Sequence, residues 1–256
     1  MGFFEDFQKI IINVSQELTL IRSNSDASAI IQTKTPLLAE DYKVVVQKVV
    51  WKIPHISVSD VEKLRLFKYL ESNRDLNLAF RSWELHEYPV LQETMRHTWA
   101  VKSTSLVARP RFLIFALSTD RKNKVKKNIT VFNHCNLTNF KLYLNSEMYP
   151  HGNLNLNFDT KQWAILYEMY ASFQKSFYYR QHGEPCYEPI KFHGVCPFVV
   201  VDCSRQNETL KTGAIDIRLE FETSKNIPAN TTAFCLILHD RLVKYNPLTN
   251  IVRTIS

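Results

Sequence analysis

The stretch IDIRLEFETSKNIPANTTAFCLILHDRLVKY, residues 215–245, decides the fold class of this chain of 256 residues. From Ile215 to Phe221 every second residue is apolar and the residues between them are charged, which is the pattern of a half-buried strand. Residues 233–238, AFCLIL, are apolar on both faces and predict a strand that is covered on both sides. Asn and Pro within residues 226–230 supply the turn. The stretch therefore predicts a long antiparallel hairpin.

Comparable runs of β-branched and aromatic residues predict seven more strands. They lie at residues 16–23, 42–53, 77–91, 97–105, 109–119, 137–146 and 197–204. The chain is therefore predicted to be mainly β and antiparallel. A jelly roll fits it better than an up-and-down barrel, because the connections are long and a helix is inserted. The alternative fold is a cupin-like barrel, an enzyme that holds a metal through His and carboxylate side chains on neighbouring strands.

Two helices are predicted between the strands. A linker helix near residues 59–72 has one apolar stripe and Ser59 or Asp60 as its N-cap. A second helix near residues 160–180 begins at a cap formed by Asp159 or Thr160. Its stripe is unusually aromatic and is interpreted as facing the core; it comprises Trp163, Leu166, Tyr167, Tyr170, Phe173 and Phe177.

The composition narrows the class of protein. Apolar residues make up 45% and charged residues 22% of the chain, as in a soluble globular protein, and an aromatic content of 12% favours strands. The chain has only 5 glycines and no glycine-rich phosphate-binding motif, which argues against a Rossmann or P-loop enzyme. The net charge of +7 permits contact with nucleic acid or an anionic surface but does not require it.

The sequence predicts an intracellular protein without a membrane span. No run of eighteen apolar residues is present, and the first residues carry acids where a secretory signal would be basic. In a reducing compartment the 5 cysteines are expected to be buried thiols rather than disulfides; they are Cys135, Cys186, Cys196, Cys203 and Cys235.

One group of residues could be considered for a metal. Cys186, His193, Cys196 and Cys203 are the weak candidates, but only His193 and Cys196 have the spacing of a zinc knuckle. Cys203 also sits inside an apolar run, where a thiol behaves as a small hydrophobic side chain. We therefore expect neither a metal nor any other cofactor.

No catalytic set is predicted. The neighbours His239 and Asp240, like Asp202 and Cys203, point to opposite faces of a strand and cannot form a hydrogen-bonded pair. No nucleophile elbow or HExxH motif is present. The sequence therefore predicts a protein that is not an enzyme.

The strongest charge cluster is RKNKVKKN, residues 121–128. Five of its eight residues could contact phosphates as part of a nucleic-acid-binding module; they are Arg121, Lys122, Lys124, Lys126 and Lys127. No aromatic residue for base stacking interrupts the run, which favours a solvated loop between two strands.

Four long strings resemble one family of proteins. They are WELHEYPVL (83–91), TWAVKSTSLVARPRFLIFALSTDRKN (98–123), VFNHCNLTNFKLYLNSEMYPHGNLNLNF (131–158) and DCSRQNETLKTGAIDIRLEFETSKNIPANTTAFCLILHDRLVKYNPL (202–248). They resemble the double jelly-roll-like proteins encoded in arthropod genomes. That family in turn resembles the double jelly-roll major capsid proteins of Polinton/Maverick-type elements and large DNA viruses.

The resemblance implies a structural protein whose partners are further copies of itself. Two stacked jelly rolls per subunit and three subunits per capsomer are implied, with no catalytic residues and with a place in a virion. Members of the family carry a segment before the GFFEDF-like stretch, residues 2–7 here, that supplies the first strands. Residues 1–56 would then be the remnant of the first jelly roll, 57–75 a helical linker and 76–256 a complete second jelly roll. An incomplete first barrel leaves strand edges unpaired.

Overall fold

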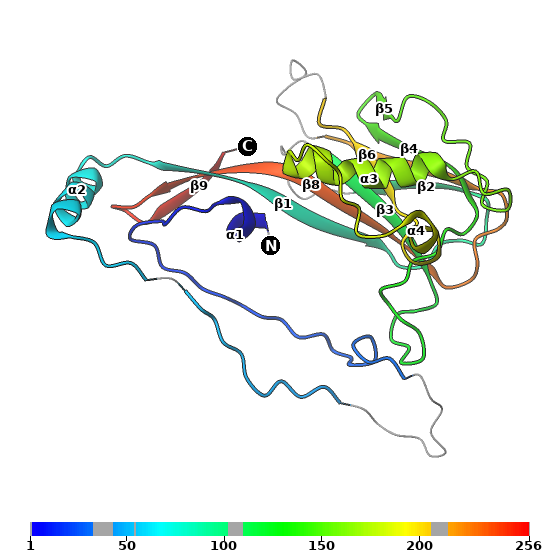
Figure 1. The fold of residues 1–256 in the computed structure, drawn as a ribbon, viewed down its shortest axis with the longest axis horizontal. Helices are drawn as coiled ribbons and strands as arrows, with labels where there is room; N and C mark the ends of the chain where they lie inside the picture. Colours follow the sequence, from blue (N-terminus) through cyan, green and yellow to red (C-terminus); the bar gives the residue numbers. More distant parts are fainter. Residues whose placement is uncertain (1, 33–42, 54, 102–109, 206–214, 256) are drawn as a thin grey trace.

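Two antiparallel sheets face each other and form the body of the molecule (Figure 1). The computed structural model describes residues 2–32, 43–53, 55–101, 110–205 and 215–255. The first sheet has the order β1 (Leu76–Tyr88), β8 (Thr231–Asn246), β3 (Pro110–Thr119), β6 (Val199–Asp202), and β9 (Ile251–Ile255) also pairs with β8. The second sheet has the order β2 (Arg96–Val101), β7 (Ile217–Thr223), β4 (Leu137–Leu144), β5 (Glu147–Tyr149).

The strand order is that of a jelly roll. The chain passes from sheet to sheet along β1 to β4 and again along β5 to β8, so that each sheet receives four of these eight strands. Eight strands divided in this way between two facing sheets form two Greek keys. The prediction of a mainly β, antiparallel jelly-roll protein is therefore confirmed.

The predicted hairpin at residues 215–245 is wrong. β7 pairs with β2 and β4, whereas β8 pairs with β1 and β3, so the two strands belong to opposite sheets. The reason lies in what each strand buries. Leu219 and Phe221 of β7 and Cys235 and Ile237 of β8 all lie in one core cluster. The chain between the strands crosses from one sheet to the other, and the apolar faces can then pack against each other.

Three phenylalanines join the two sheets at the centre of the core. The ring centroid of Phe115 on β3 lies 4.8 Å from that of Phe140 on β4 and 4.8 Å from that of Phe221 on β7. Each of the three side chains is at most 1% exposed.

Both predicted helices are present. α2 (Asp60–Glu71) is capped by Ser59, whose hydroxyl accepts from the Glu62 amide at 3.4 Å. α3 (Ala164–Tyr178) begins after Trp163 rather than at Asp159 or Thr160. The residues before it are held in a turn by the bridge between Asn157 and Gln162.

The aromatic stripe of α3 faces the core, as predicted. Phe173 and Phe177 pack on Phe112 and Leu238, which lie on the outer face of the first sheet. The sequence did not predict the short elements α1 (Gly2–Asp6), α4 (Pro189–Val195), β5 and β9.

The N-terminal part of the chain departs most from the sequence-based expectation. Residues 16–23 and 43–53 were expected to be strands, but the structure assigns no strand to either segment. Tyr42 and residues 102–105, at the ends of two expected strands, lie outside the described residues. A strand needs a neighbouring strand for its backbone, and the described residues offer none here. We call residues 14–32, 43–53 and 55–59 the strap; it leads to α2 (Figure 1).

Candidate interaction surfaces

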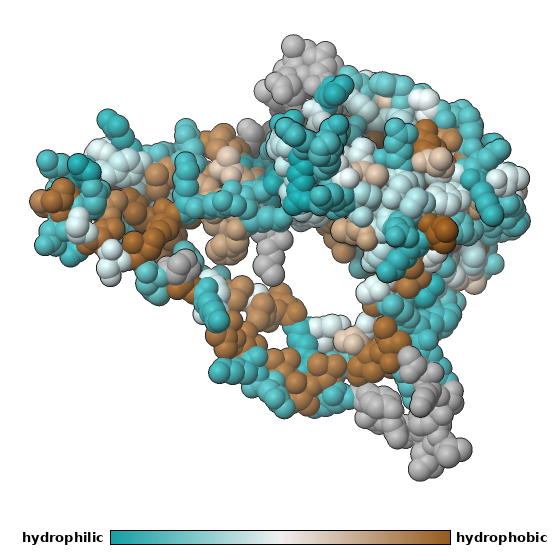
Figure 2. Space-filling model, viewed as in Figure 1, coloured by the Kyte–Doolittle hydropathy of each residue, from teal (hydrophilic) through white to brown (hydrophobic). Residues whose placement is uncertain are grey.

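Apolar side chains gather along the strap and on α2 (Figure 2). In the strap the exposed ones are Leu18, Leu20, Ile21, Ile31, Val45, Val46, Val49, Val50, Trp51, Ile53 and Ile56. On α2, Val61, Leu64 and Phe67 are each about 60% exposed at positions that share one helix face. Contiguous exposed apolar surface on a soluble protein marks a site of interaction. The linker helix was predicted correctly, and none of its side chains is fully buried.

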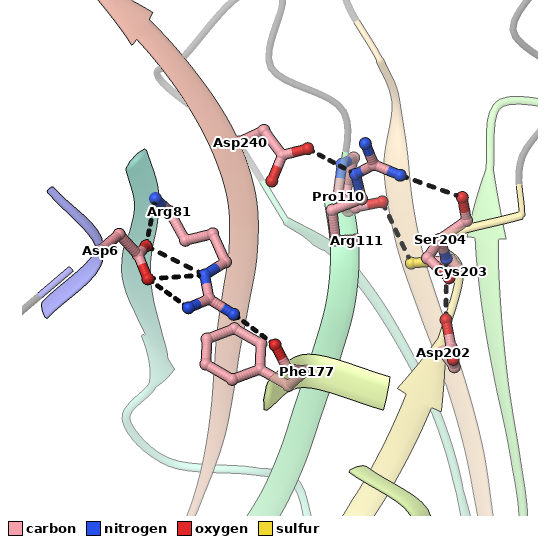
Figure 3. Close-up of polar contacts among 9 residues, drawn as sticks. All are labelled: Asp6, Arg81, Pro110, Arg111, Phe177, Asp202, Cys203, Ser204 and Asp240. Atoms are coloured by element: carbon pink, nitrogen blue, oxygen red, sulfur yellow. Dashed lines mark hydrogen bonds and ion pairs between the residues drawn. The ribbon is translucent and has the colours of Figure 1, made fainter. Parts of the chain in front are cut away.

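The N-terminal helix α1 is fastened to β1 by Arg81 (Figure 3). The Asp6 carboxylate accepts hydrogen bonds from the Arg81 amide at 2.7 Å and from its Nε at 2.9 Å. The same guanidinium donates to the Phe177 carbonyl and lies 3.8 Å from the centroid of the Phe177 ring. Phe3 packs edge-on against Phe80, with 5.1 Å between the ring centroids. The hydrogen bond from Arg81 lowers the pKa of Asp6.

Replacing Arg81 with methionine is expected to detach α1. The Asp6 carboxylate would lose its guanidinium donors and keep only the backbone amide of residue 81. Hydrogen bonds to charged groups each contribute about 1.5–3 kcal/mol. Amide hydrogen exchange of residues 2–13 should accelerate at least tenfold. The control is Arg180→Met, since Arg180 lies 3.9 Å from Glu184 in an exposed pair. Unchanged exchange in the Arg81 variant would contradict this role.

The basic loop anchors the strap. The Asn123 amide donates to the Ser28 hydroxyl at 3.0 Å, and the Gln32 amide donates to the Val125 carbonyl at 2.7 Å. The run of positive charge therefore includes a contact point for a segment almost a hundred residues earlier in the chain.

Neighbouring groups already engage most of the predicted phosphate-contacting side chains. Lys122 pairs with Glu87 at 2.9 Å, and both Lys124 and Lys127 pair with Asp120. These two lysines lower the pKa of Asp120 to about 2. Arg121 donates to the Asn133 side chain and to the Asn128 carbonyl, each at 3.3 Å. Among the described residues, Lys126 alone of the five has no such contact, so the geometry does not favour a nucleic-acid interface.

The four metal candidates do not form a cluster. Within the described ranges no three His, Cys, Asp or Glu side chains gather as a metal site. Cys203 is buried and donates to the Pro110 carbonyl at 3.3 Å (Figure 3), and Cys196 is buried beside α4. Cys186 is exposed, so the expectation of a buried thiol is wrong for this residue, which lies in the connection between α3 and α4.

The interior of the sandwich holds an acid and two imidazoles beside β1. Glu84 and His86 lie 3.2 Å apart, and the buried His239 has no partner for its Nε2 among the described atoms. The cupin-like alternative would need His and carboxylate side chains to converge on a metal. Among the described residues no three His, Cys, Asp or Glu side chains lie together as a metal site. Asp240 lies on the opposite face of β8 from His239 and pairs with Arg111 at 2.6 Å (Figure 3).

A pair of stacked histidines was not predicted. The His134 ring stacks on Phe158 at 4.3 Å between centroids and lies 5.4 Å from the His193 ring. The Asn136 amide donates to His134 Nδ1 at 3.0 Å, so this nitrogen carries no proton. Burial and the neighbouring His193 lower the pKa of His134. The two histidines are far apart in sequence, and no motif links them.

The fold is expected to lose stability in mild acid. Burial lowers the pKa of both His134 and His239, whereas in the unfolded chain each titrates near 6.5. The unfolded state therefore binds more protons below about pH 6.5, and stability falls from that pH downward toward the folded pKa values. The urea midpoint should be lower at pH 5.5 than at pH 7.5. His134→Asn, which keeps an acceptor, should reduce the difference, and the exposed His182→Asn should not. Equal midpoints at both pH values would refute the prediction.

Within the part of the chain that the structure describes, no helix is both long and apolar enough to cross a membrane.

Comparison with protein families agrees with the jelly-roll topology. The family model of the double jelly roll-like domain matches residues 1–243. No curated protein matches the chain. Among solved structures, a chain of the Sputnik virophage, determined by cryo-EM at 3.5 Å, is 12% identical with a TM-score of 0.43. The match covers 70% of this chain and 39% of the virophage chain, so this chain spans well under half of the protein that it matches.

Proposed function

Because the chain belongs to the double jelly roll-like domain family, we propose that it is a structural, capsid-like subunit that associates with copies of itself. Its assembled form is a homotrimeric capsomer, in a virion or in a genome-resident derivative of one. The observation that carries the proposal is the exposed apolar surface of the strap and α2. Such a surface has to be covered in a stable particle.

The division of the chain supports this proposal. Residues 76–256 contain all eight strands of one jelly roll, and we assign them to the second barrel. Residues 57–75 are the linker, which includes α2. Residues 1–56 are assigned to the first barrel, because the β-branched run in the strap has strand-forming sequence but no sheet partner among the described residues.

The role is structural rather than catalytic. His239 and Asp240 lie on opposite faces of β8, and Asp240 pairs with Arg111. The most strongly held acids, Asp6 and Asp120, pair with cations and are separate from each other. Such pairs hold segments together and provide no base beside a nucleophile.

Sedimentation velocity at increasing protein concentration tests the proposal. A trimer or a larger species is expected, and electron microscopy should show particles. Leu64→Ser together with Phe67→Ser should weaken assembly without unfolding the subunit, since both side chains point to solvent. The control is Ile190→Ser on α4, an equally apolar side chain that is 85% exposed. A protein that stays monomeric at high concentration and forms no particles would contradict the proposal.

A further inference from the structure

One long edge of the first sheet has no neighbouring strand in the part of the chain that the structure describes. β1 pairs with β8 in a continuous register from Leu76 to Tyr88, and no other described strand pairs with it. The Arg81 amide donates to Asp6, which shows that the amides of odd-numbered residues point away from β8. From Ser82 to Tyr88, therefore, the backbone groups of the odd-numbered residues face outward. An edge of this kind is a template for another strand.

A matching segment without a partner lies in the strap. Residues 45–53 are extended, and the structure gives them no hydrogen-bond partner among the described residues. Four of these nine residues are valines, which favour strands. Val44, just before the segment, is held by Asp26 and Arg22.

The two segments match in apolar surface and carry no opposing like charges. Residues 45–53 contain two lysines and no acid, and residues 82–88 contain neither lysine nor arginine to repel them. The two glutamates of the edge already have neighbours, since Glu84 lies beside His86 and Glu87 pairs with Lys122. Trp83 and Leu85 on the edge are 36% and 56% exposed and could pack against the exposed valines. Apolar contact across a strand pair is stabilising, whereas like charges directly opposite each other would weaken it.

The same chain cannot readily bring the two segments together. The strap is bonded to the basic loop through Ser28 and Gln32, and the end of α2 is tied to Asn246 through Asn73 and Asp75. Between these fixed points residues 43–53 run apart from β1, and the earlier arm of the strap, residues 14–32, is drawn between them (Figure 1).

We infer that residues 45–53 of one copy add as a strand to the free edge of β1 in a second copy. The inference rests on the proposed self-association and names the contact that produces it. Donor and acceptor are different parts of the chain, so each copy can both give and receive a strand. Passed on in one direction from copy to copy, the contact is heterologous. Repetition of one such contact closes a ring when the rotation between copies allows it.

Proline variants test the strand addition. Proline has no amide donor, and the amides of adjacent residues in a strand point in opposite directions. The double variant V49P/V50P therefore removes one amide that would face the edge of β1, whichever way the donor strand is turned. L85P removes an amide of β1 that points away from β8 and should leave the sheet intact. Each variant alone should associate at least tenfold more weakly than the wild-type protein in sedimentation velocity. The control is I21P in the strap, which should associate normally.

A mixture of the two variants decides whether the contact forms between copies. The double valine variant still has a free β1 edge and L85P still has an intact donor, so an equimolar mixture should form a 1:1 complex that neither forms alone. If L85P does not fold by circular dichroism, L85K replaces it, since a lysine there would repel the lysines of the donor. Variants that assemble like the wild type, or folded variants that form no mixed complex, would overturn the inference and leave self-association standing. A wild-type protein that stays monomeric would contradict both the strand addition and the proposed self-association.

Discussion

Replacing Leu219 with aspartate should unfold the subunit. The side chain is 0% exposed at the centre of β7, where its backbone neighbours on either side are Trp99 of β2 and Leu142 of β4. An unpaired carboxylate in such a place carries an effective penalty of several kcal/mol, in addition to the lost leucine packing. Since a domain is stable by only about 5–15 kcal/mol, the loss should be close to complete.

Circular dichroism and urea unfolding measure this loss, and the neighbouring position supplies the control. Arg218→Asp introduces the same charge one residue earlier on the exposed face of β7, where Arg218 stacks on Tyr143 and pairs with Glu220. That variant should remain folded. A cooperative unfolding transition of near wild-type stability for Leu219→Asp would mean that β7 does not bury this face.

The alternation that identifies Leu219 as buried was visible in the sequence, but the partner strands were not. A period of two shows which side chains share a face and leaves open which strand lies alongside. Residues 217–223 and 231–246 are therefore correct as strands and wrong as a hairpin. The Asn and Pro residues between them indicate a change of direction, and this is equally compatible with a crossing to the opposite sheet.

In the strap, a strand-forming composition does not produce a strand. Residues 43–53 have the β-branched composition of a strand, and the described structure nevertheless leaves them without one. Propensity in sheets depends on the neighbouring strands, and sequence composition cannot supply a missing neighbour. Residues 60–71 were predicted reliably because a helix satisfies its backbone within its own segment.

The contacts that fasten the N-terminal segment were beyond prediction for a related reason. Asp6 and Arg81 are 75 residues apart, and neither stands in a motif. The basic loop was recognised as a charge cluster, but its bonds to Ser28 and Gln32 depend on where the strap passes. Sequence identifies the groups that need partners, and the fold decides which partners they meet.

Replacing Phe115 with alanine should cost about 3–5 kcal/mol of folding stability, the usual range for a buried phenylalanine. Its ring bridges the sheets by contacts with Phe140 and Phe221, so its removal leaves a cavity where the two layers meet. The urea midpoint should fall accordingly, and Phe115→Leu, which fills most of the space, should lose much less.

The same variant separates stability from assembly. Phe115 lies in the core, remote in the sequence from the strap and the free edge of β1, and is only 1% exposed. Under conditions where Phe115→Ala is still folded, it should therefore associate to the same stoichiometry as the wild-type protein. A loss of stability below about 1 kcal/mol would show that the two sheets are not packed as described, because a filled core cannot lose a whole ring at so small a cost.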